Sequence, residues 1–292
     1  MVPDAAGIAQ ELSGARARLK RMFSQGALHT GLITWAIFSL YPLLWISVAS
    51  VKYQSEFFAH PFSFPAHFVW GNFKQAWELA DMRAYFINSL IVTVTSSTFL
   101  LLFSAMCGFV LARFEFRFKG VIWAYVLFGF LIPPTLTLIP LAQLSRTLHF
   151  YDTRIGLILV YMAVGIPFNT FFLRSYMETI PKELEEAALI DGAGMWTVFR
   201  RLIVPLSKPA LTTMATFSVL YAWSEFMIAL ILTGSPNGRT LPVGISDIAT
   251  TFSSNDTTIA AAMVISILPA LVVFILLQRY VVEGLSAGAL KA

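Results

Sequence analysis

Residues 85–112 read YFINSLIVTVTSSTFLLLFSAMCGFVLA, a run of 28 residues without a single Asp, Glu, Lys or Arg. A transmembrane helix needs about 20 consecutive apolar residues, so this run is long enough to cross a bilayer. It also lacks the alternation of apolar and polar residues that marks a strand of a membrane barrel. The run therefore predicts a transmembrane α-helix.

Five other stretches of the chain have the same character. Glu225 is the one charged residue in the interior of any of them. The sequence therefore predicts an all-α polytopic membrane protein with six transmembrane helices, at about residues 29–51, 85–112, 120–145, 155–173, 208–232 and 257–279.

The composition of the 292 residues excludes other classes of protein. Hydrophobic residues make up 57% and charged residues 12%, whereas a soluble domain carries about 25% charged residues. With a mean hydropathy of +0.73, too little polar surface is left to cover a soluble enzyme, and a disordered chain would need far more charge. The single cysteine, Cys107, excludes an intrachain disulfide and a cysteine-based zinc cluster.

Lys and Arg residues are distributed unequally between the two sides of the predicted membrane. Fourteen lie on the side that holds both termini and six lie on the other side. Positive charge concentrates on the cytoplasmic side. We therefore expect both termini to be cytoplasmic, with residues 1–27 as a cytoplasmic tail and residues 28–292 as the membrane domain. The basic segment 113–119 is expected to act only as a stop signal between two spans.

The first outer loop, residues 52–83, is rich in aromatic residues and proline. Aromatic rings favour the boundary between membrane and water. The loop is therefore predicted to lie along the membrane surface, either as a lid without a ligand or as a binding surface.

The loop between spans four and five, residues 175–207, is polar and long for a connection in a compact bundle. Pro181 suits the first turn of a helix, whose positive N-terminal end would attract Glu183, Glu185 and Glu186. Gly192 suits the left-handed conformation that often ends a helix. A second helical stripe follows, made of Met195, Phe199, Leu202 and Ile203. We expect a short helix, a tight turn and a second amphipathic helix, offered to a soluble partner on the cytoplasmic side.

This loop contains Glu186-Ala187-Ala188, then Gly192 after three residues, then Leu202-Ile203-Val204-Pro205. The pattern resembles the EAA motif of ABC-importer permeases, in which the loop is a coupling helix that docks into the ATP-hydrolysing subunit. The resemblance implies a role in ATPase coupling for Glu186, Ala187, Ala188, Asp191, Gly192 and Pro205.

Two further segments are similar to the carbohydrate branch of that family. Residues 221–226, YAWSEF, look like the Trp-Asn-Glu/Asp-Phe stretch of carbohydrate permeases, although Ser224 stands where Asn is usual. Residues 284–291 are similar to the C-terminus of MalG-like permease subunits. The resemblance implies an importer in the plasma (inner) membrane of a prokaryote. Its implied partners are a second, MalF-like permease, a dimer of ATP-binding subunits and an extracytoplasmic solute-binding protein.

The chain contains no G-x-x-x-x-G-K-[ST], H-E-x-x-H or G-x-S-x-G motif. The first of these builds the phosphate cradle of an ATPase. We therefore expect no enzyme activity, no cofactor and no metal site in this chain, with ATP and Mg used by the partner ATPase.

A carboxylate inside a membrane is a functional candidate by default. Glu225 is therefore predicted to lie on the translocation path or at its outer gate, unless it is a structural hydrogen-bonding residue. Asn169, Trp223 and Ser224 are the other candidates for the path. The prolines of spans three and four break helical hydrogen bonding, which can open a polar cavity or simply kink the helix.

The outer run Gly234-Ser235-Pro236-Asn237-Gly238 is polar and forms turns. We expect it to contact the solute-binding protein, the alternative being an ordinary connecting turn. Two other classes of function fit less well: a secondary transporter would need ionisable residues in several spans, and a membrane-embedded enzyme would need a catalytic constellation. The resemblance implies a sugar or oligosaccharide as the solute, the alternatives being a sugar phosphate and a non-sugar compound.

Overall fold

The computed structural model describes residues 5–79, 82–251 and 255–289, and the side chains of residues 25–78, 82–250 and 255–280. Every regular element in these ranges is a helix, so the prediction of an all-helical protein is confirmed. The longest are α1 (Ala5–Ala49), α4 (Met82–Arg113), α7 (Arg154–Met177), α11 (Lys208–Ser224) and α14 (Asp256–Ala289). The shorter elements are α2 (Gln54–Ala59), α3 (Gly71–Leu79), α5 (Lys119–Leu131), η1 (Pro134–Thr137), α6 (Leu138–Thr147), α8 (Glu183–Ile190), α9 (Met195–Val198), η2 (Phe199–Ile203), α10 (Val204–Leu206), α12 (Met227–Leu232) and α13 (Leu241–Thr251).

Four of the described helices are long and apolar enough to cross a membrane alone. They are Gln25–Ala49 within α1, the whole of α4 and α7, and Asp256–Tyr280 within α14. Two bent pairs pass the same test together: α5 with the segment from η1 to α6, bent by 94°, and α9–α10 with α11, bent by 75°. The described part of the chain therefore holds four to six candidate spans.

Two of the predicted spans are not continuous helices. The stretch 120–145 breaks after Leu131, because Pro133 and Pro134 have no N–H to donate, and α6 then leaves at a steep angle. The stretch 208–232 stops at Ser224 and resumes at Met227. At the other end of the chain, α1 begins at Ala5, so most of the predicted tail continues the helix of the first span; residues 1–4 and 290–292 lie outside the described residues.

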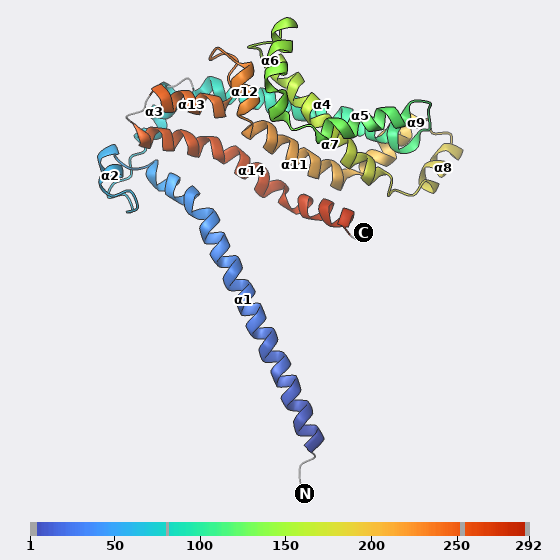
Figure 1. Cartoon of the computed structure of the whole chain (residues 1–292), viewed down its shortest axis with the longest axis horizontal. Helices are drawn as coiled ribbons and strands as arrows, with labels where there is room; N and C mark the ends of the chain where they lie inside the picture. The colour runs from blue at the N-terminus through green and yellow to red at the C-terminus, as the bar shows by residue number, and fades with distance from the viewer. Residues whose placement is uncertain (1–4, 80–81, 252–254, 290–292) are drawn as a thin grey trace.

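The centre of the bundle is the pair α4 and α7, against which α11 and then α14 pack. These helices lie alongside one another in Figure 1. The buried face of α4 includes five small polar residues, Ser89, Thr93, Ser96, Ser97 and Ser104. Small residues let membrane helices approach closely. At Gly108 a Cβ atom would lie 3.1 Å from the backbone nitrogen of Arg174 on α7, so the two backbones are in near contact there.

The two ends of this bundle carry different elements. In Figure 1, α8 and α9 lie at one end and α3 and α13 lie at the other, while α1 projects away from the bundle. A cluster of buried apolar residues fills the end near α9, including Phe109, Met177, Phe199, Ile203 and Met214. A second cluster near α13 includes Met82, Tyr85, Trp223, Leu241 and Ile248. The large apolar side chains of α1 between Leu28 and Leu44 are exposed, except that of Leu43, which is half-buried.

The outer loop is held together by polar side chains under an aromatic surface. Lys52 is fully buried and its Nζ donates a hydrogen bond to the carbonyl of His60 at 2.9 Å. The side-chain amide of Asn72 donates to the carbonyls of Ser50 and Lys52. Several aromatic rings of the loop stay exposed, namely those of Phe58, Phe62, Phe64, Phe68 and Trp70. This surface suits either the lid or the binding surface that the sequence predicts.

Candidate partner-docking sites and translocation path

Helix α8 presents almost its whole circumference to the surroundings. All of its residues are exposed except Glu185, which is buried, and Ala188, which is half-buried. The apolar side chains of Leu184 and Ala187 are open to the surroundings, and Glu186 of the Glu-Ala-Ala sequence is exposed beside them. A short helix that leaves its apolar side chains uncovered is suited to contact with another protein.

The end of α8 is fixed by Gly192, as the sequence predicts. Gly192 has φ of +84°, the left-handed region that a side chain would disfavour. The N–H of Gly192 donates to the carbonyl of Leu189, and the N–H of Ala193 donates to that of Ala188, both at 3.0 Å. These two hydrogen bonds form a Schellman motif. The chain can therefore reverse sharply after Asp191, the C-cap residue.

Arg113 joins α8 to the membrane bundle. Its Nε lies 2.5 Å from Oε1 of Glu185, and the two side chains are only 4% and 8% exposed. Its Nη2 also donates to the carbonyl of Ile180 at 2.9 Å. The expectation that segment 113–119 is merely a stop signal is therefore wrong for Arg113. Its guanidinium group is buried, and a buried charge is stable only when it is paired, here with the carboxylate of Glu185.

The second half of the loop packs onto the bundle. Phe199 and Ile203 are buried, as predicted for the amphipathic stripe, while Met195 and Trp196 are exposed. The helix is not regular, because the π-helical segment η2 separates α9 from α10, which contains Pro205. A groove of about 180 Å³ opens beside it, lined by Met106, Phe109, Val110, Phe114, Met195, Trp196 and Phe199.

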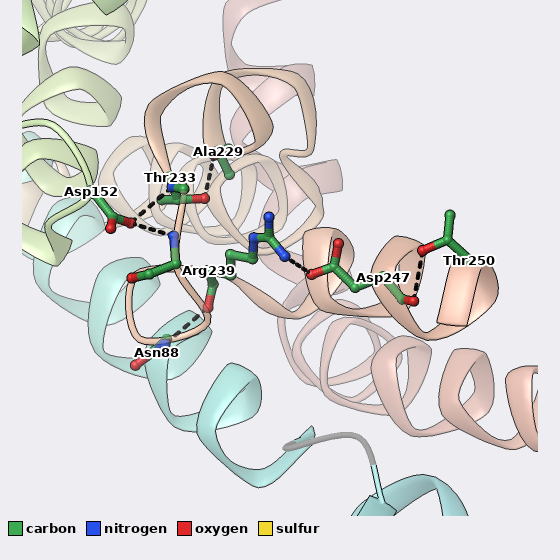
Figure 2. Close-up of polar contacts among 9 residues, drawn as sticks. Asn88, Asp152, Ala229, Thr233, Arg239, Asp247 and Thr250 are labelled. Carbon is green, nitrogen blue, oxygen red and sulfur yellow. Dashed lines mark hydrogen bonds and ion pairs between the residues drawn. The ribbon is translucent and has the colours of Figure 1, made fainter. Parts of the chain in front are cut away.

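At the opposite side of the membrane, the predicted contact turn is held by Asp152. One carboxylate oxygen of Asp152 accepts hydrogen bonds from the backbone N–H groups of Gly234 at 2.9 Å and Ser235 at 3.0 Å. Figure 2 shows Asp152 pointing at this turn from the segment that precedes α7. Gly238 is packed so closely that a Cβ atom there would lie 2.9 Å from the Asp152 carboxylate.

The electrostatic state of Asp152 follows from these contacts. Partial burial raises the pKa of this carboxyl group, but the hydrogen bonds donated by Ser235 and Gly234 and the charge of Arg239 outweigh that effect. The net pKa lies below the ordinary value of an aspartate. Asp152 is therefore a charged tether at neutral pH.

The far end of the same turn rests on α4. The side-chain amide of Asn88 donates to the carbonyls of Asn237 and Arg239, both at 2.9 Å, and Ser89 Oγ accepts the N–H of Leu241. Arg239 forms an ion pair with Asp247 of α13, which is also visible in Figure 2. Of the five residues predicted to contact the binding protein, Gly234, Pro236 and Asn237 are exposed, Ser235 is half-buried and Gly238 is buried.

The predicted path residues are not brought together. Asn169 and Ser218 share a hydrogen bond and border a cavity of about 310 Å³ between α4, α7 and α11. Its walls are Leu100, Pro134, Val164, Gly165, Phe168, Asn169, Phe217, Ser218 and Tyr221. Trp223 and Ser224 instead border a separate groove toward α14, where the indole N–H of Trp223 donates to the carbonyl of Ser266.

Glu225 occupies the break between α11 and α12. Its two carboxylate oxygens accept the backbone N–H groups of Ile228 at 2.7 Å and Ala229 at 3.0 Å, and Tyr161 donates its hydroxyl to the same group at 2.9 Å. A carboxylate that accepts the first free N–H groups of a helix stabilises its N-terminus. This geometry favours the structural interpretation of Glu225 over a contact on the path.

Four residues that position these sites were missed from the sequence: Asn88, Arg113, Asp152 and Tyr161. Their partners lie 64 to 151 residues away along the chain, so no local pattern connects them. The one available signal was the polar or charged character of Asn88 and Arg113 at the edges of a predicted span. Among the described residues, no group of three or more His, Cys, Asp or Glu side chains could hold a metal ion.

The described helices form a bundle of candidate membrane spans, with an exposed short helix at one end and a tethered turn at the other, and this arrangement suits a transport permease. Residues 101–286 match the family of binding-protein-dependent transport system inner membrane components, and the chain belongs to this family. It is thus a multi-pass membrane protein and a component of an importer that depends on a binding protein.

Relatives and solved structures agree with this assignment. The chain is 34% identical over 283 residues to the diacetylchitobiose uptake system permease protein NgcG of Streptomyces coelicolor, covering 96% of this chain and 93% of the relative. It is 32% identical over 251 residues to the melibiose/raffinose/stachyose import permease protein MelC of Bacillus subtilis, covering 86% and 91%. The fold matches a chain of a bacterial ABC transporter involved in alginate import, with a TM-score of 0.79 at 23% identity over 90% of this chain and 98% of that chain.

Proposed function

We propose that this chain is one of two permease subunits of an ATP-driven importer for a sugar or oligosaccharide. It forms the translocation path together with a second, MalF-like permease. An extracytoplasmic binding protein delivers the solute to the outer turn, and a dimer of ATP-binding subunits docks on α8 from the cytoplasm. ATP and Mg are used in that partner, and both termini of this chain face the cytoplasm in the inner membrane of a prokaryote.

The exposed helix α8 with its left-handed Gly192 is the observation that carries this proposal. A helix whose apolar residues remain uncovered needs a partner, and its position in the loop between α7 and α11 places it on the side that is richest in Lys and Arg. The family's dependence on a binding protein favours this function over a self-contained secondary transporter.

The names of the relatives favour a sugar as the solute, since they denote diacetylchitobiose and the melibiose–raffinose–stachyose group. The cavity beside Asn169 also suits a sugar. Phe168, Phe217 and Tyr221 offer aromatic faces there, and Asn169 and Ser218 offer polar atoms. Binding sites for small molecules combine apolar and aromatic walls with a few placed polar groups in this way.

The docking proposal is tested by exchanging Gly192 for valine. The left-handed backbone costs a residue with a side chain roughly 1–2 kcal/mol, which corresponds to a factor of about 5–30 in an equilibrium constant. Gly192→Val should reduce the amount of ATPase subunit that co-purifies with the permease by about that factor, while the permease still inserts into the membrane.

Gly194→Val is the matched control. Gly194 lies two residues further on, has an ordinary φ of −76° and also has open space around its Cβ position. It should leave the complex intact. Equal ATPase recovery in the Gly192 and Gly194 variants would show that α8 is not the docking site.

The solute class is tested on the solute-binding protein that works with this permease. Its thermal stability is measured against diacetylchitobiose, raffinose, an alginate oligosaccharide and a sugar phosphate. A shift with one of the sugars supports the proposal, and a shift with the sugar phosphate alone overturns its sugar part.

A further inference from the structure

Helix α4 differs from the other long helices in containing no proline. Its 32 residues contain no proline, whereas α1, α7 and α14 contain Pro42, Pro167 and Pro269. The two remaining candidate spans are bent by 94° and 75°. At 1.5 Å per residue, α4 is a rod of about 48 Å. Proline weakens a helix by removing one hydrogen bond and crowding a carbonyl, and α4 has no such weak point along its length.

Both candidate partner surfaces are attached to this one helix. Near its start, Asn88 and Ser89 hold the backbone from Asn237 to Leu241. At its last residue, Arg113 holds Glu185 of α8. The two attachment points, Asn88 and Arg113, are about 37 Å apart along the helix.

The inner attachment combines one buried ion pair with one small apolar contact. Glu185 is the one buried residue of α8, and half-buried Ala188 packs against the apolar cluster at this end of the bundle. Arg113 reaches both Glu185 and the carbonyl of Ile180, just before α8 begins. An arginine with its planar, forked donors is suited to such a double contact, and lysine would reproduce only the charge.

We propose that Arg113 is a positioning residue for energy coupling. It fixes α8 to the inner end of α4, so that the ATPase-docking helix and the outer turn move as parts of one rigid element. A displacement of the outer turn by the binding protein then reaches α8 through α4. This inference rests on the proposed function, in which α8 receives the ATPase.

The position of α8 is measured first on the permease alone, so that this test does not depend on any partner. Spin labels are placed at Ile190 on α8, which is 86% exposed, and at Phe116 beyond the end of α4, in a Cys107→Ala background. The label–label distance should be narrowly distributed with Arg113 present and broad in Arg113→Met and Glu185→Gln. A distribution that stays narrow in both variants overturns the proposal.

The consequence for coupling is measured in the reconstituted importer. ATP hydrolysis is recorded with and without the binding protein, loaded with the sugar that stabilises it most in the thermal screen. Arg113→Met and Glu185→Gln should keep the ATPase subunit and basal hydrolysis but lower the stimulation about fivefold or more. The exchanged pair Arg113→Glu with Glu185→Arg should restore part of the stimulation and narrow the distribution of label distances again, because it re-forms the ion pair but not the hydrogen bond to the Ile180 carbonyl.

Glu115→Gln is the matched control, because it removes an exposed ion pair with Lys119 from the same end of α4. It should change neither readout. A residue that merely stabilised the fold would lower melting temperature, assembly and basal hydrolysis together, and that result overturns the positioning role. If the ATPase fails to bind the unaltered permease, the proposed function fails, while the label distances still decide whether Arg113 positions α8.

Discussion

Asp152 shows how one side chain can set the geometry of a surface that lies far from it in the sequence. It has φ of +60°, a conformation that aspartate and asparagine tolerate better than most residues. That conformation turns its carboxylate toward the N–H groups of Gly234 and Ser235. The outer turn therefore has a fixed position before any partner arrives, which lowers the entropy cost of binding.

The pKa of Asp152 leads to a prediction about pH. Because the folded pKa lies below the ordinary value, near 3.9, the tether contributes stability above that ordinary value and loses it as the pH falls through the lowered pKa. The melting temperature of the purified permease should exceed that of Asp152→Ala at pH 6. This difference in melting temperature should shrink as the pH falls below about 4. A remainder should persist at low pH, because alanine at positive φ carries a backbone penalty of roughly 1–2 kcal/mol.

Asp152→Asn separates these two contributions. Asparagine tolerates the left-handed conformation and keeps one acceptor oxygen, but it has no charge to titrate. This variant should melt between the other two proteins at pH 6 and, like Asp152→Ala, should lack the pH dependence that the Asp152 carboxyl group contributes. A pH dependence equal to that of the unaltered protein would show that another group is responsible.

At the scale of elements, the features predicted correctly from the sequence are those set by residues close together in the chain. The position of α8 and of its turn followed from the glutamates at the start of the helix and from Gly192 after it. The sequence identified the prolines of spans three and four as helix breakers alike, but the helix ends just before Pro133 and Pro134 and continues through Pro167 in α7. The sequence also did not reveal the Arg113–Glu185 and Asn88–Asn237 contacts, which pair residues from separate helices.

The outer turn is predicted to transmit the signal of the binding protein. Replacing Ser235-Pro236-Asn237 by three glycines removes the side chains that a partner would touch, but it keeps the Asn237 carbonyl that Asn88 holds. The loss of local rigidity and contact area should abolish the stimulation of ATP hydrolysis by loaded binding protein. Basal hydrolysis and assembly should be unchanged. Full stimulation in this variant would mean that the segment is only a connecting turn.

At the scale of the whole molecule, the two surfaces lie on opposite sides of one compact set of helices. The described structure places α8 at one end and the elements near α13 at the other (Figure 1). The distribution of Lys and Arg, fourteen against six, predicts which end is cytoplasmic. If that orientation were reversed, α8 would face the binding protein and the proposed docking of an ATPase would be impossible.

Cysteine labelling in intact cells tests this orientation, and the structure selects the positions. Ser207 lies in the predicted cytoplasmic loop but is fully buried, so a cysteine there would stay unlabelled on either side of the membrane. Thr179, just before α8, and Asn237, in the outer turn, are both exposed.

In a Cys107→Ala background, a membrane-impermeant thiol reagent should label Asn237→Cys in intact cells. It should label Thr179→Cys only after the membrane is permeabilised. Substitution at Asn237 leaves its backbone carbonyl available to Asn88, so the turn keeps its position. Labelling of Thr179→Cys in intact cells would show that the topology is the opposite of the predicted one. It would then remove the basis for placing the ATPase on α8.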